Sequence, residues 1–294
     1  GAAIEVTGVL FELTDPRSRL SRTESRGKVF SAIGELAWYL SGSSDVSHMR
    51  YYVPTYERHL TGDSVPSAYG PRAILWNQTK QINNVMRQLR RRDSRRAVIQ
   101  LFDATDLRRG VAEAPCTCTM QFLNRSDRLD LHVSMRSNDL IKGFPHDVFC
   151  FTMIQEIFAA RLGLGLGKYK HFVGSLHKYV RHDDEATEFI GEGLQDNVPM
   201  PTMPTSDVCG DLKRFLEAER VIRESGYTEQ ILEGVTPEYW RDIVALLGAF
   251  RIHKSRKNPE MLSSLYSELS SDVYKPYIQA KIDQHREGTN DPTN

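Results

Sequence analysis

Cysteine is scarce in this sequence, which limits the disulfide and metal chemistry that it can support. Four cysteines occur among 294 residues, at positions 116, 118, 150 and 209. They follow no recognisable secretory signal, so we expect reduced thiols and no disulfide framework. Cys116 and Cys118 are too close together for a zinc knuckle, and no second His/Cys pair stands at finger spacing, so we expect no metal.

Long apolar runs and an excess of charge of one sign are also missing. The most apolar stretch, residues 148–164, contains Gln155, Glu156 and Arg161, which a bilayer would not accept. We therefore expect a buried helix there, in a soluble, cytoplasmic protein without membrane contact. Lys+Arg and Asp+Glu are equal at 38 each, so no overall positive field exists to hold nucleic acid.

Hydrophobic periodicity predicts an α/β chain. Val29, Ile33 and Leu36 fall at helical spacing, and Gly42 follows them as a stop. Residues 129–135 instead alternate between apolar and polar side chains, as in a strand with one face in a core. The expected strands are 3–13, 96–102, 119–123, 129–135 and 172–180, the expected helices are 28–40, 77–91 and 146–162, and 45–75 is expected to be rich in loops.

The chain changes character near its last third. Residues 206–294 are highly charged and helical in pattern, and we expect them to form a helical C-terminal extension. Residues 1–205 contain all the expected strands, and we expect them to form a catalytic domain.

A series of short motifs runs along the first two thirds of the chain. They are ELAWYLSGSS (35–44), AYG (68–70), DSRR (93–96), APC (114–116), MRSND (135–139), GFPHD (143–147) and GSLHKYVRH (174–182). Together, in this order and at these spacings, they closely resemble the thymidylate synthase superfamily over roughly residues 1–185. The wording of the last three motifs resembles the cytidylate hydroxymethylase branch. The resemblance implies a large mixed sheet flanked by helices, and a homodimer.

The resemblance also implies a reaction at C5 of a pyrimidine nucleotide. The implied reaction transfers a one-carbon unit from 5,10-methylenetetrahydrofolate to dCMP or CMP and adds water, which gives a 5-hydroxymethyl nucleotide and tetrahydrofolate. A methylase that delivers hydride and releases dihydrofolate remains the alternative. No residue that we can place distinguishes ribose from deoxyribose.

Cys116 matches the nucleophile of that family. C5 of a pyrimidine is a poor nucleophile until a thiolate adds to C6, and a thiolate both attacks and leaves readily. A cysteine at the start of a strand is otherwise most often a small core residue. The surrounding motifs favour catalysis for Cys116, whereas Cys118, Cys150 and Cys209 keep the structural interpretation.

Arginines supply the expected phosphate site. Arg136 and Ser137 resemble the phosphate ligands that a subunit provides to its own site, and Arg136 also stands beside the nucleophile. Arg95 and Arg96 resemble the pair that reaches the partner's phosphate across a dimer, since guanidinium forks bind phosphate oxygens in pairs. Alternatively, residues 87–96 are a solvated helix end or an RNA-binding patch. The zero net charge and the lack of an aromatic-basic motif argue against RNA.

Further family matches describe the rest of the pocket. His177 and Tyr179 are two apart in a strand and match the pair that holds the sugar hydroxyl. Glu35 matches the glutamate that manages water and protons, although on spacing alone it could be an exposed helix residue. The remaining matches are Tyr69 as the pocket tyrosine, and Asp139 and Gly143 on the folate side.

Asp147 departs from thymidylate synthase in an informative way. The matching residue there is an asparagine, which pairs with N3–H and O4 of uracil, whereas cytosine presents a donor at N4 and an acceptor at N3. A carboxylate accepts from the N4 amino group and can share a proton with N3, which eases thiolate addition at C6. The alternative is an N-cap of the helix that follows, because HDVF has that pattern.

Other departures concern the surroundings of the site. Thr117 replaces the family's His after the nucleophile, and Met135 replaces the Gln before the phosphate arginine. The pocket tryptophans have no clear counterpart in residues 45–70. The Arg-Thr-Gly phosphate loop expected ahead of Ala3 is absent, so we expect a truncated chain, and the family's C-terminal closing segment is not recognisable.

Overall fold

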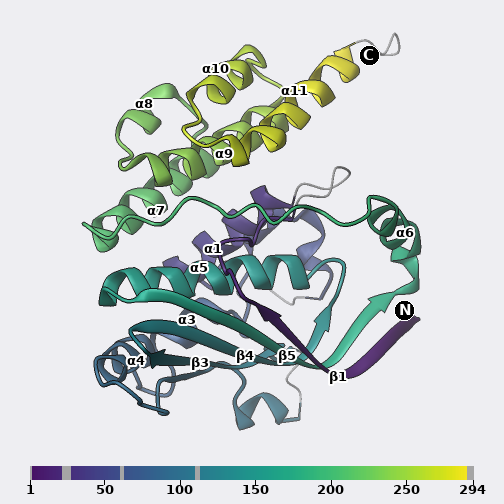
Figure 1. Ribbon diagram of the computed structural model, residues 1–294. Coiled ribbons are helices and arrows are strands. Elements are labelled where there is room, and N and C mark those ends of the chain that lie inside the picture. The colour runs from purple at the N-terminus through teal and green to yellow at the C-terminus, as the bar shows by residue number, and fades with distance from the viewer. Residues whose placement is uncertain (1, 22–27, 60–62, 110–112, 290–294) are drawn as a thin grey trace. The chain divides into compact units, whose positions relative to one another are not determined.

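The computed structural model describes residues 2–21, 28–59, 63–109 and 113–289 (Figure 1). The chain divides into two compact units, residues 1–199 and 200–294. Among the described residues, the strands all lie in the first unit and the second unit is helical.

One mixed sheet organises the first unit. The strands are β1 (Ala3–Leu13), β2 (Val98–Gln100), β3 (Thr117–Arg125), β4 (Arg128–Asp139) and β5 (Gly165–Tyr179). Their order is β1-β5-β4-β3-β2, and every neighbouring pair is antiparallel except β4–β5, which is parallel. The large mixed sheet expected from the sequence is confirmed.

The β3–β4 hairpin has the geometry that the alternating pattern predicts. Ser126 and Asp127 close the hairpin with φ values of 52° and 55°. Two central residues with positive φ give a turn whose twist matches that of the paired strands. Leu129, Leu131 and Val133 are buried, so one face of β4 packs into the core and the other carries polar groups.

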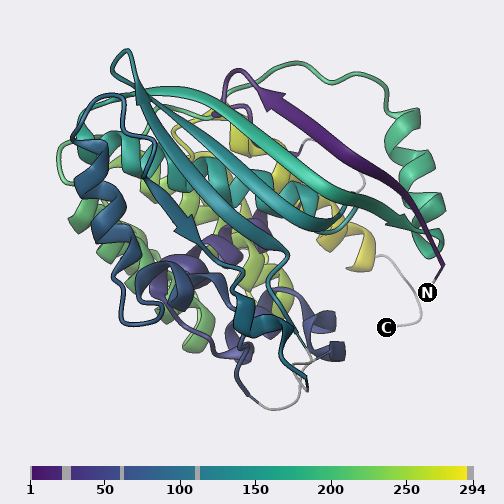
Figure 2. The same cartoon turned by 90° about the horizontal axis from the view of Figure 1, so that it is seen from below.

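Helices cover one face of this sheet. The described helices of this unit are α1 (Val29–Ser41), α2 (Val46–Tyr52), α3 (Tyr69–Ile74), α4 (Gln81–Leu89), α5 (Phe144–Leu162) and α6 (Asp183–Gly191), with 3-10 turns at Pro54–His59, Ala104–Leu107 and Val180–His182. α6 lies beyond the end of β5 and not over the sheet (Figure 1). α5 runs along the sheet in Figure 1, and the strands lie in front of it in the view of Figure 2. Because β4 and β5 are parallel, α5 is the crossover that joins them. Gly42 and Gly163 end α1 and α5 in the left-handed conformation.

Several predicted boundaries are wrong for local reasons. Residues 45–75 are not mainly loop, because they hold α2, a 3-10 turn and α3. The helix expected from residue 77 begins at Gln81, since Asn77 and Gln78 adopt positive φ in a tight turn. β5 begins seven residues before the predicted start at residue 172, directly after the Gly163 cap.

The second unit is a helical bundle with its own core. Its helices are α7 (Val208–Glu224), α8 (Glu229–Glu233), α9 (Glu238–Ser255), α10 (Glu260–Glu268) and α11 (Lys275–Thr289), with a 3-10 turn at Asp272–Tyr274. Trp240 is fully buried, and its ring centroid lies 5.0 Å from that of Phe215. The predicted C-terminal helical character is confirmed. In the described residues of either unit, no helix is long and apolar enough to span a bilayer.

Candidate active site

Cys116 stands immediately before β3, beside Arg136 of β4. The backbone N–H of Arg136 donates to the carbonyl of Cys116 at 2.8 Å. The Arg136 side chain then turns back on the same segment, where Nε donates to the Pro115 carbonyl at 3.0 Å and Nη2 to the Ala114 carbonyl at 2.9 Å. The predicted phosphate arginine therefore holds the chain just ahead of the predicted nucleophile.

Burial and charge act in opposite directions on the Cys116 thiol. Burial raises its pKa above the ordinary value, and the positive charge of Arg136 lowers it. Asp147 and Glu113 raise it further, so the net pKa is raised. Arg136 is thus the main charge that favours thiolate at this position.

Tyr69 restrains the chain on the other side of Cys116. Its hydroxyl oxygen accepts the backbone N–H of Thr117 at 3.1 Å. Its ring lies between those of Tyr39 and Phe151, at centroid distances of 5.2 Å and 6.3 Å. Both neighbouring rings restrict the rotation of Tyr69, which keeps its hydroxyl against the start of β3.

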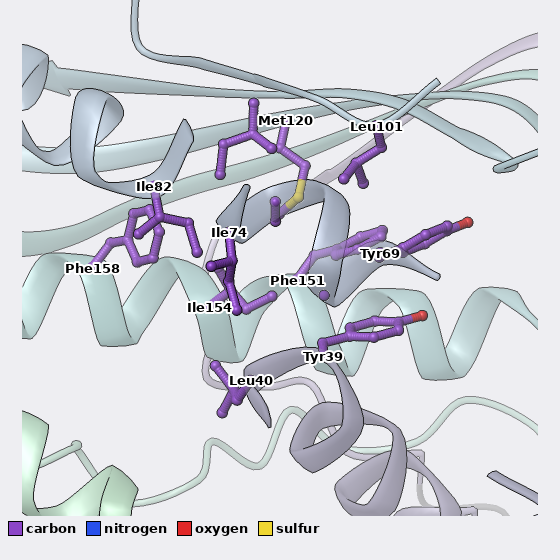
Figure 3. A pocket seen from close by; sticks show the side chains of 13 residues that line it. Tyr39, Leu40, Tyr69, Ile74, Ile82, Leu101, Met120, Phe151, Ile154 and Phe158 are labelled. Carbon is purple, nitrogen blue, oxygen red and sulfur yellow. The ribbon is translucent and has the colours of Figure 1, made fainter. Parts of the chain in front are cut away.

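An apolar cavity lies behind these tyrosines (Figure 3). Its walls come from α1, α3, α4, α5 and the strands β2 and β3, and include Ile82, Met120 and Phe158. In Figure 3 the hydroxyl groups of Tyr39 and Tyr69 point to the same side, away from the apolar wall. The cavity backs the two tyrosines but contains none of the predicted charged residues.

Asp147 is buried in the first turn of α5 and does not cap the helix. The helix begins at Phe144 after Gly143, and no side chain caps its N-terminus. Asp147 already makes the helical hydrogen bond from its own N–H to the Gly143 carbonyl, at 2.9 Å. The N-cap alternative is therefore wrong. Burial first, and then the charge of Glu35, raise the pKa of Asp147 well above its ordinary value, and an amide hydrogen bond from Asn138 lowers it.

Glu35 and Tyr39 form a pair on one side of α1. They are four residues apart, and the Tyr39 hydroxyl donates to Glu35 Oε1 at 2.5 Å. Glu35 also affects the pKa of Asp147, so the two carboxyl groups are electrostatically coupled. Two neighbouring carboxyl groups in different surroundings can divide acid and base roles between them.

The remaining predicted residues gather where β4 and β5 end. Ser137 Oγ lies 3.4 Å from His177 Nδ1, and the rings of His177 and Tyr179 are 5.1 Å apart and perpendicular. Asp139 pairs with His177 in the sheet register. Its Oδ1 accepts the N–H groups that follow it in the turn, at 2.8 Å and 3.1 Å.

Gly143 follows that turn, and a side chain has no room there. A Cβ at this position would lie 2.8 Å from Asn138 Oδ1 and 3.6 Å from Asp147 Oδ2. Glycine therefore lets β4 and the start of α5 approach closely, which brings Asn138 and Asp147 together.

Arg95 and Arg96 lie on an exposed turn between α4 and β2. Both side chains are exposed to solvent, together with Arg90, Arg91 and Arg92. Exposure fits a solvated helix end and equally fits donation to a second subunit.

Tyr39, Asn138 and His171 lie close to the predicted residues but were not predicted themselves. Tyr39 could have been found from its spacing of four from Glu35 on a helix. Asn138 lies inside MRSND and is 3% exposed, and His171 is completely buried. His171 makes its polar contacts with Tyr169 on its own strand and with Asn138 and Met135 on β4, and the β4 partners leave no local pattern in the sequence. Among the described residues no group of His, Cys, Asp or Glu has the arrangement of a metal site.

Comparison with known proteins places this geometry in a family. A family model described as thymidylate synthase matches residues 11–218, which is more than half of the chain. The deoxyuridylate hydroxymethyltransferase of Delftia phage PhiW-14 is 26% identical over 205 residues, covering 65% of this chain and 57% of that protein. The thymidylate synthase of Bacillus licheniformis is 32% identical over 165 residues, covering 52% and 58%. The chain thus spans somewhat more than half the length of these curated relatives.

Solved structures with a similar fold are also thymidylate synthases. Thymidylate synthase from T4 phage superposes with a TM-score of 0.60 at 21% identity, over 73% of this chain and 83% of that chain. Thermostable thymidylate synthase A from Bacillus subtilis gives 0.56 at 25% identity, over 67% and 73%. The family match and the shared sheet agree: this chain belongs to the thymidylate synthase family.

Proposed function

We propose that the protein is a cytidylate 5-hydroxymethyltransferase. In this reaction a one-carbon unit passes from 5,10-methylenetetrahydrofolate to C5 of dCMP or CMP, water adds, and tetrahydrofolate leaves. The observation that carries the proposal is that the Asp147 carboxyl group is buried in the first turn of α5 and does not cap the helix. A buried carboxyl group without a structural partner of opposite charge is costly, which favours a functional role.

The raised pKa of Asp147 suits recognition of cytosine. Its raised pKa lets the carboxyl group hold a proton at higher pH than an exposed aspartate does. It can then accept from the N4 amino group and share its proton with N3 of the base. A proton at N3 draws electrons from the ring and favours attack at C6. An asparagine at the same place would suit the uracil edge instead.

Cys116 and Arg136 suit the covalent step. The Cys116 thiolate adds to C6, and the electron pair of the C5–C6 bond forms the new bond from C5 to the one-carbon unit. Loss of the C5 proton and of tetrahydrofolate leaves an exocyclic methylene, and the thiolate departs once water has added. The Arg136 charge favours the thiolate at the start. Within the described residues its Nε and Nη2 donate to backbone carbonyls, so Nη1 is the guanidinium nitrogen left to bind a phosphate oxygen.

Glu35 and Tyr39 support hydration of that methylene. Their hydrogen-bonded pair can order a water molecule and accept its proton. Hydride transfer instead requires a dry site with a stacked folate. The aromatic side chain hydrogen-bonded to Glu35 is Tyr39, whose hydroxyl group favours bound water. The relative from Delftia phage PhiW-14 carries the name of a hydroxymethyltransferase.

The folate would be held on the side of Asp139. Only Oδ1 of its carboxyl group makes hydrogen bonds within the part of the chain that the structure describes. Oδ2 is therefore suited to an N–H group of the pterin ring. When bound, the folate supplies the one-carbon unit. This chain supplies the carboxylate that orients it and the close Gly143 turn beside it.

A homodimer would complete the phosphate site. Ile4, Val6 and Leu10 of β1 and Phe172 of β5 are exposed on the sheet, and a second copy packed there would bury them. The exposed Arg95 and Arg96 would then reach the partner's phosphate, beside Arg136 and Ser137. The sugar hydroxyl would be held by His177 and Tyr179.

Product analysis with four nucleotides tests the proposal. The enzyme is incubated with methylenetetrahydrofolate and, separately, CMP, dCMP, UMP or dUMP in water labelled with oxygen-18. We expect a 5-hydroxymethyl cytosine nucleotide that carries the label, with no rise in dihydrofolate absorbance. A 5-methyl product with stoichiometric dihydrofolate would identify a methylase, and turnover confined to UMP or dUMP would reject the cytidylate assignment.

A further inference from the structure

An ion pair joins α6 to the turn between β4 and α5. This turn, residues 139–143, contains Asp139 and Gly143, which the proposed function assigns to the folate. The ammonium group of Lys142 donates to both carboxylate oxygens of Glu185, at 2.9 Å and 2.7 Å. Glu185 lies in the first turn of α6, beyond the end of β5 in Figure 1 and 43 residues further along the chain. Nothing in the proposed mechanism uses this ion pair.

Lys142 connects Glu185 to the Asp139 carboxylate. Its backbone N–H donates to Asp139 Oδ1 at 3.1 Å, next to the Ile141 N–H, which donates at 2.8 Å. One residue therefore orients Asp139 with its main chain and binds α6 with its side chain. A lysine stem is flexible on its own. Contact with both oxygens of Glu185 restrains this stem, and so it restrains the turn that orients Asp139.

The base of the turn is fixed separately by β5. Asp139 pairs with His177 in the parallel register, and the Leu140 N–H donates to the His177 carbonyl at 2.8 Å. Further along, Lys28, which precedes α1, donates to the Ile141 carbonyl. The contact with α6 is therefore the one that acts at the far end of the turn, next to Gly143.

A histidine orients Glu185 for this contact. His182 Nδ1 lies 3.2 Å from Glu185 Oε1, and the two side chains are 12% and 15% exposed. The Arg181 Nε–H donates to His182 Nε2 at 3.3 Å, so Nε2 accepts and the ring proton stands on Nδ1, facing Glu185. Glu185 is thus held between an ammonium group and an imidazole N–H. Because Glu185 is largely removed from water, its ion pair with Lys142 is screened less than a fully exposed pair.

We infer that Glu185 is a positioning residue for the folate: supported by His182, it holds Lys142 and thereby keeps the Asp139 turn in the arrangement that binds the pterin ring. The inference rests on the proposed function, in which Asp139 holds the folate. Glu185 acts through Lys142 and Asp139 and does not itself contact the folate.

A second ion pair of α6 provides a matched control. Lys178 of β5 donates to Asp183, which lies in the same first turn of α6 as Glu185. That pair joins β5 to α6 and includes no residue of the 139–143 turn. Asp183→Asn and Glu185→Gln each remove one carboxylate charge near the N-terminus of α6, so they change the interaction with the helix dipole alike. An effect of Glu185→Gln that Asp183→Asn lacks is therefore not a general loosening of α6.

Amide hydrogen exchange of the free enzyme reports on the turn directly. The enzyme is exchanged in deuterium oxide without ligand, and mass spectrometry follows a peptide that covers residues 139–143. We expect about fivefold faster exchange in Glu185→Gln and in Lys142→Met, because the Ile141 and Lys142 N–H groups are held less firmly on Asp139. Asp183→Asn should exchange at the wild-type rate.

Folate affinity supplies the second measurement. We expect the Kd of tetrahydrofolate, from calorimetry with and without nucleotide, to rise about three- to fivefold in Glu185→Gln and Lys142→Met, which is the effect of a partly exposed ion pair. The KM for methylenetetrahydrofolate, with whichever of the four nucleotides turns over, should rise equally, while kcat and the KM for the nucleotide change less than twofold. Lys142→Arg keeps the charge and should stay near the wild type.

The double variant tests whether the two residues act as one unit. Glu185→Gln combined with Lys142→Met should lose no more folate affinity than either single variant, because both remove the same contact. Additive losses would show that the two residues act separately and would overturn the inference.

The remaining outcomes separate the inference from the proposed function. The Lys142 side chain is 44% exposed, so Lys142→Met keeps the test open if Glu185→Gln does not fold. Unchanged exchange and folate affinity in the folded variants would overturn the inference, and so would equal changes in Asp183→Asn. A wild-type enzyme inactive on CMP and dCMP would reject the proposed substrate. The exchange rates and the Kd of tetrahydrofolate would still decide the role of Glu185, because neither depends on which base is the substrate.

Discussion

The hydroxyl oxygen of Tyr69 accepts the backbone N–H of Thr117 at 3.1 Å, one residue after Cys116. On the other side, Arg136 holds the carbonyls of Ala114 and Pro115. Cys116, the proposed nucleophile, therefore stands on a short segment that is restrained at both ends, which would limit its motion relative to a bound base.

Tyr69→Phe should reduce kcat more than it changes KM for the nucleotide. The substitution keeps the ring between Tyr39 and Phe151 but removes the acceptor for the Thr117 N–H. An unpaired buried donor costs about 1–3 kcal/mol, so we expect about a tenfold or larger loss in kcat. Steady-state kinetics over a range of nucleotide concentrations would separate the two constants. A change in KM alone would mean that Tyr69 serves binding and not the placement of Cys116.

Cys116→Ser should lose turnover by several orders of magnitude and still bind nucleotide. A serine hydroxyl is a far weaker nucleophile toward C6 than a thiolate. Cys118→Ser, two residues further on within β3, is the matched control and should remain largely active. Turnover assays and nucleotide titration by calorimetry measure the two properties. Equal loss in the two variants would remove Cys116 from its assigned role.

Two inactive variants should restore activity when mixed. One carries Cys116→Ser and the other carries Arg95→Ala with Arg96→Ala. After subunit exchange at equal amounts, half of the dimers are mixed and each has one intact site, so about a quarter of wild-type activity should return. If exchange is verified by a mass label and activity does not return, the arginines are not donated between subunits.

Asp147→Asn should weaken activity on the cytosine nucleotide and raise affinity for the uracil nucleotide. Losing a complementary buried hydrogen bond costs about 1–3 kcal/mol, which is about a ten- to hundredfold change in preference. Asp130→Asn is the control, because Asp130 lies on β4 and accepts the Lys168 N–H at 2.7 Å. Competition assays with both nucleotides present measure the preference directly. An unchanged preference in Asp147→Asn would argue that another group recognises the base.

The buried imidazole of His171 should give stability a pH dependence. Its pKa is lowered from 6.5 to about 4 in the folded state, so between these values the unfolded chain binds more protons and stability falls as pH falls. Asp147, with its raised pKa, acts in the opposite direction, so the comparison must be made with a variant. From pH 6.5 to 4 the wild type should lose on the order of 3 kcal/mol relative to His171→Phe. Urea unfolding at several pH values measures this difference, and parallel curves for the two proteins would show that His171 is not neutral when folded.

The parts of the fold that sequence could predict are those with a regular local pattern. Leu129, Leu131 and Val133 alternate with polar residues, and they are buried as that alternation predicts. α2 was missed, although the Asp45 side chain caps it by accepting the Ser47 N–H at 2.8 Å, because a seven-residue helix shows little periodicity.

In the candidate site too, residues that lie within local motifs could be predicted, and contacts between residues distant in sequence could not. Residues within motifs, such as Cys116 and Arg136, could be predicted, because the motif order carried the resemblance. The contact between Asn138 and His171 could not, since the two residues are 33 apart in sequence and meet only through the parallel β4–β5 register. The sequence predicts that α5 begins at residue 146, but the helix begins at Phe144. A start at residue 146 leaves a capping role open for Asp147. Its position in the first turn excludes that role.

Because α5 joins the parallel strands β4 and β5, a large part of the candidate site is encoded by one continuous stretch of sequence. Residues 128–179 form one uninterrupted strand–helix–strand segment. It carries Arg136, Asp147 and His177, which means that the proposed phosphate, base and sugar contacts travel together in a single stretch of gene. A recombination event that replaced this stretch would exchange nucleotide preference as a unit, while the Cys116 strand and α1 stayed with the recipient.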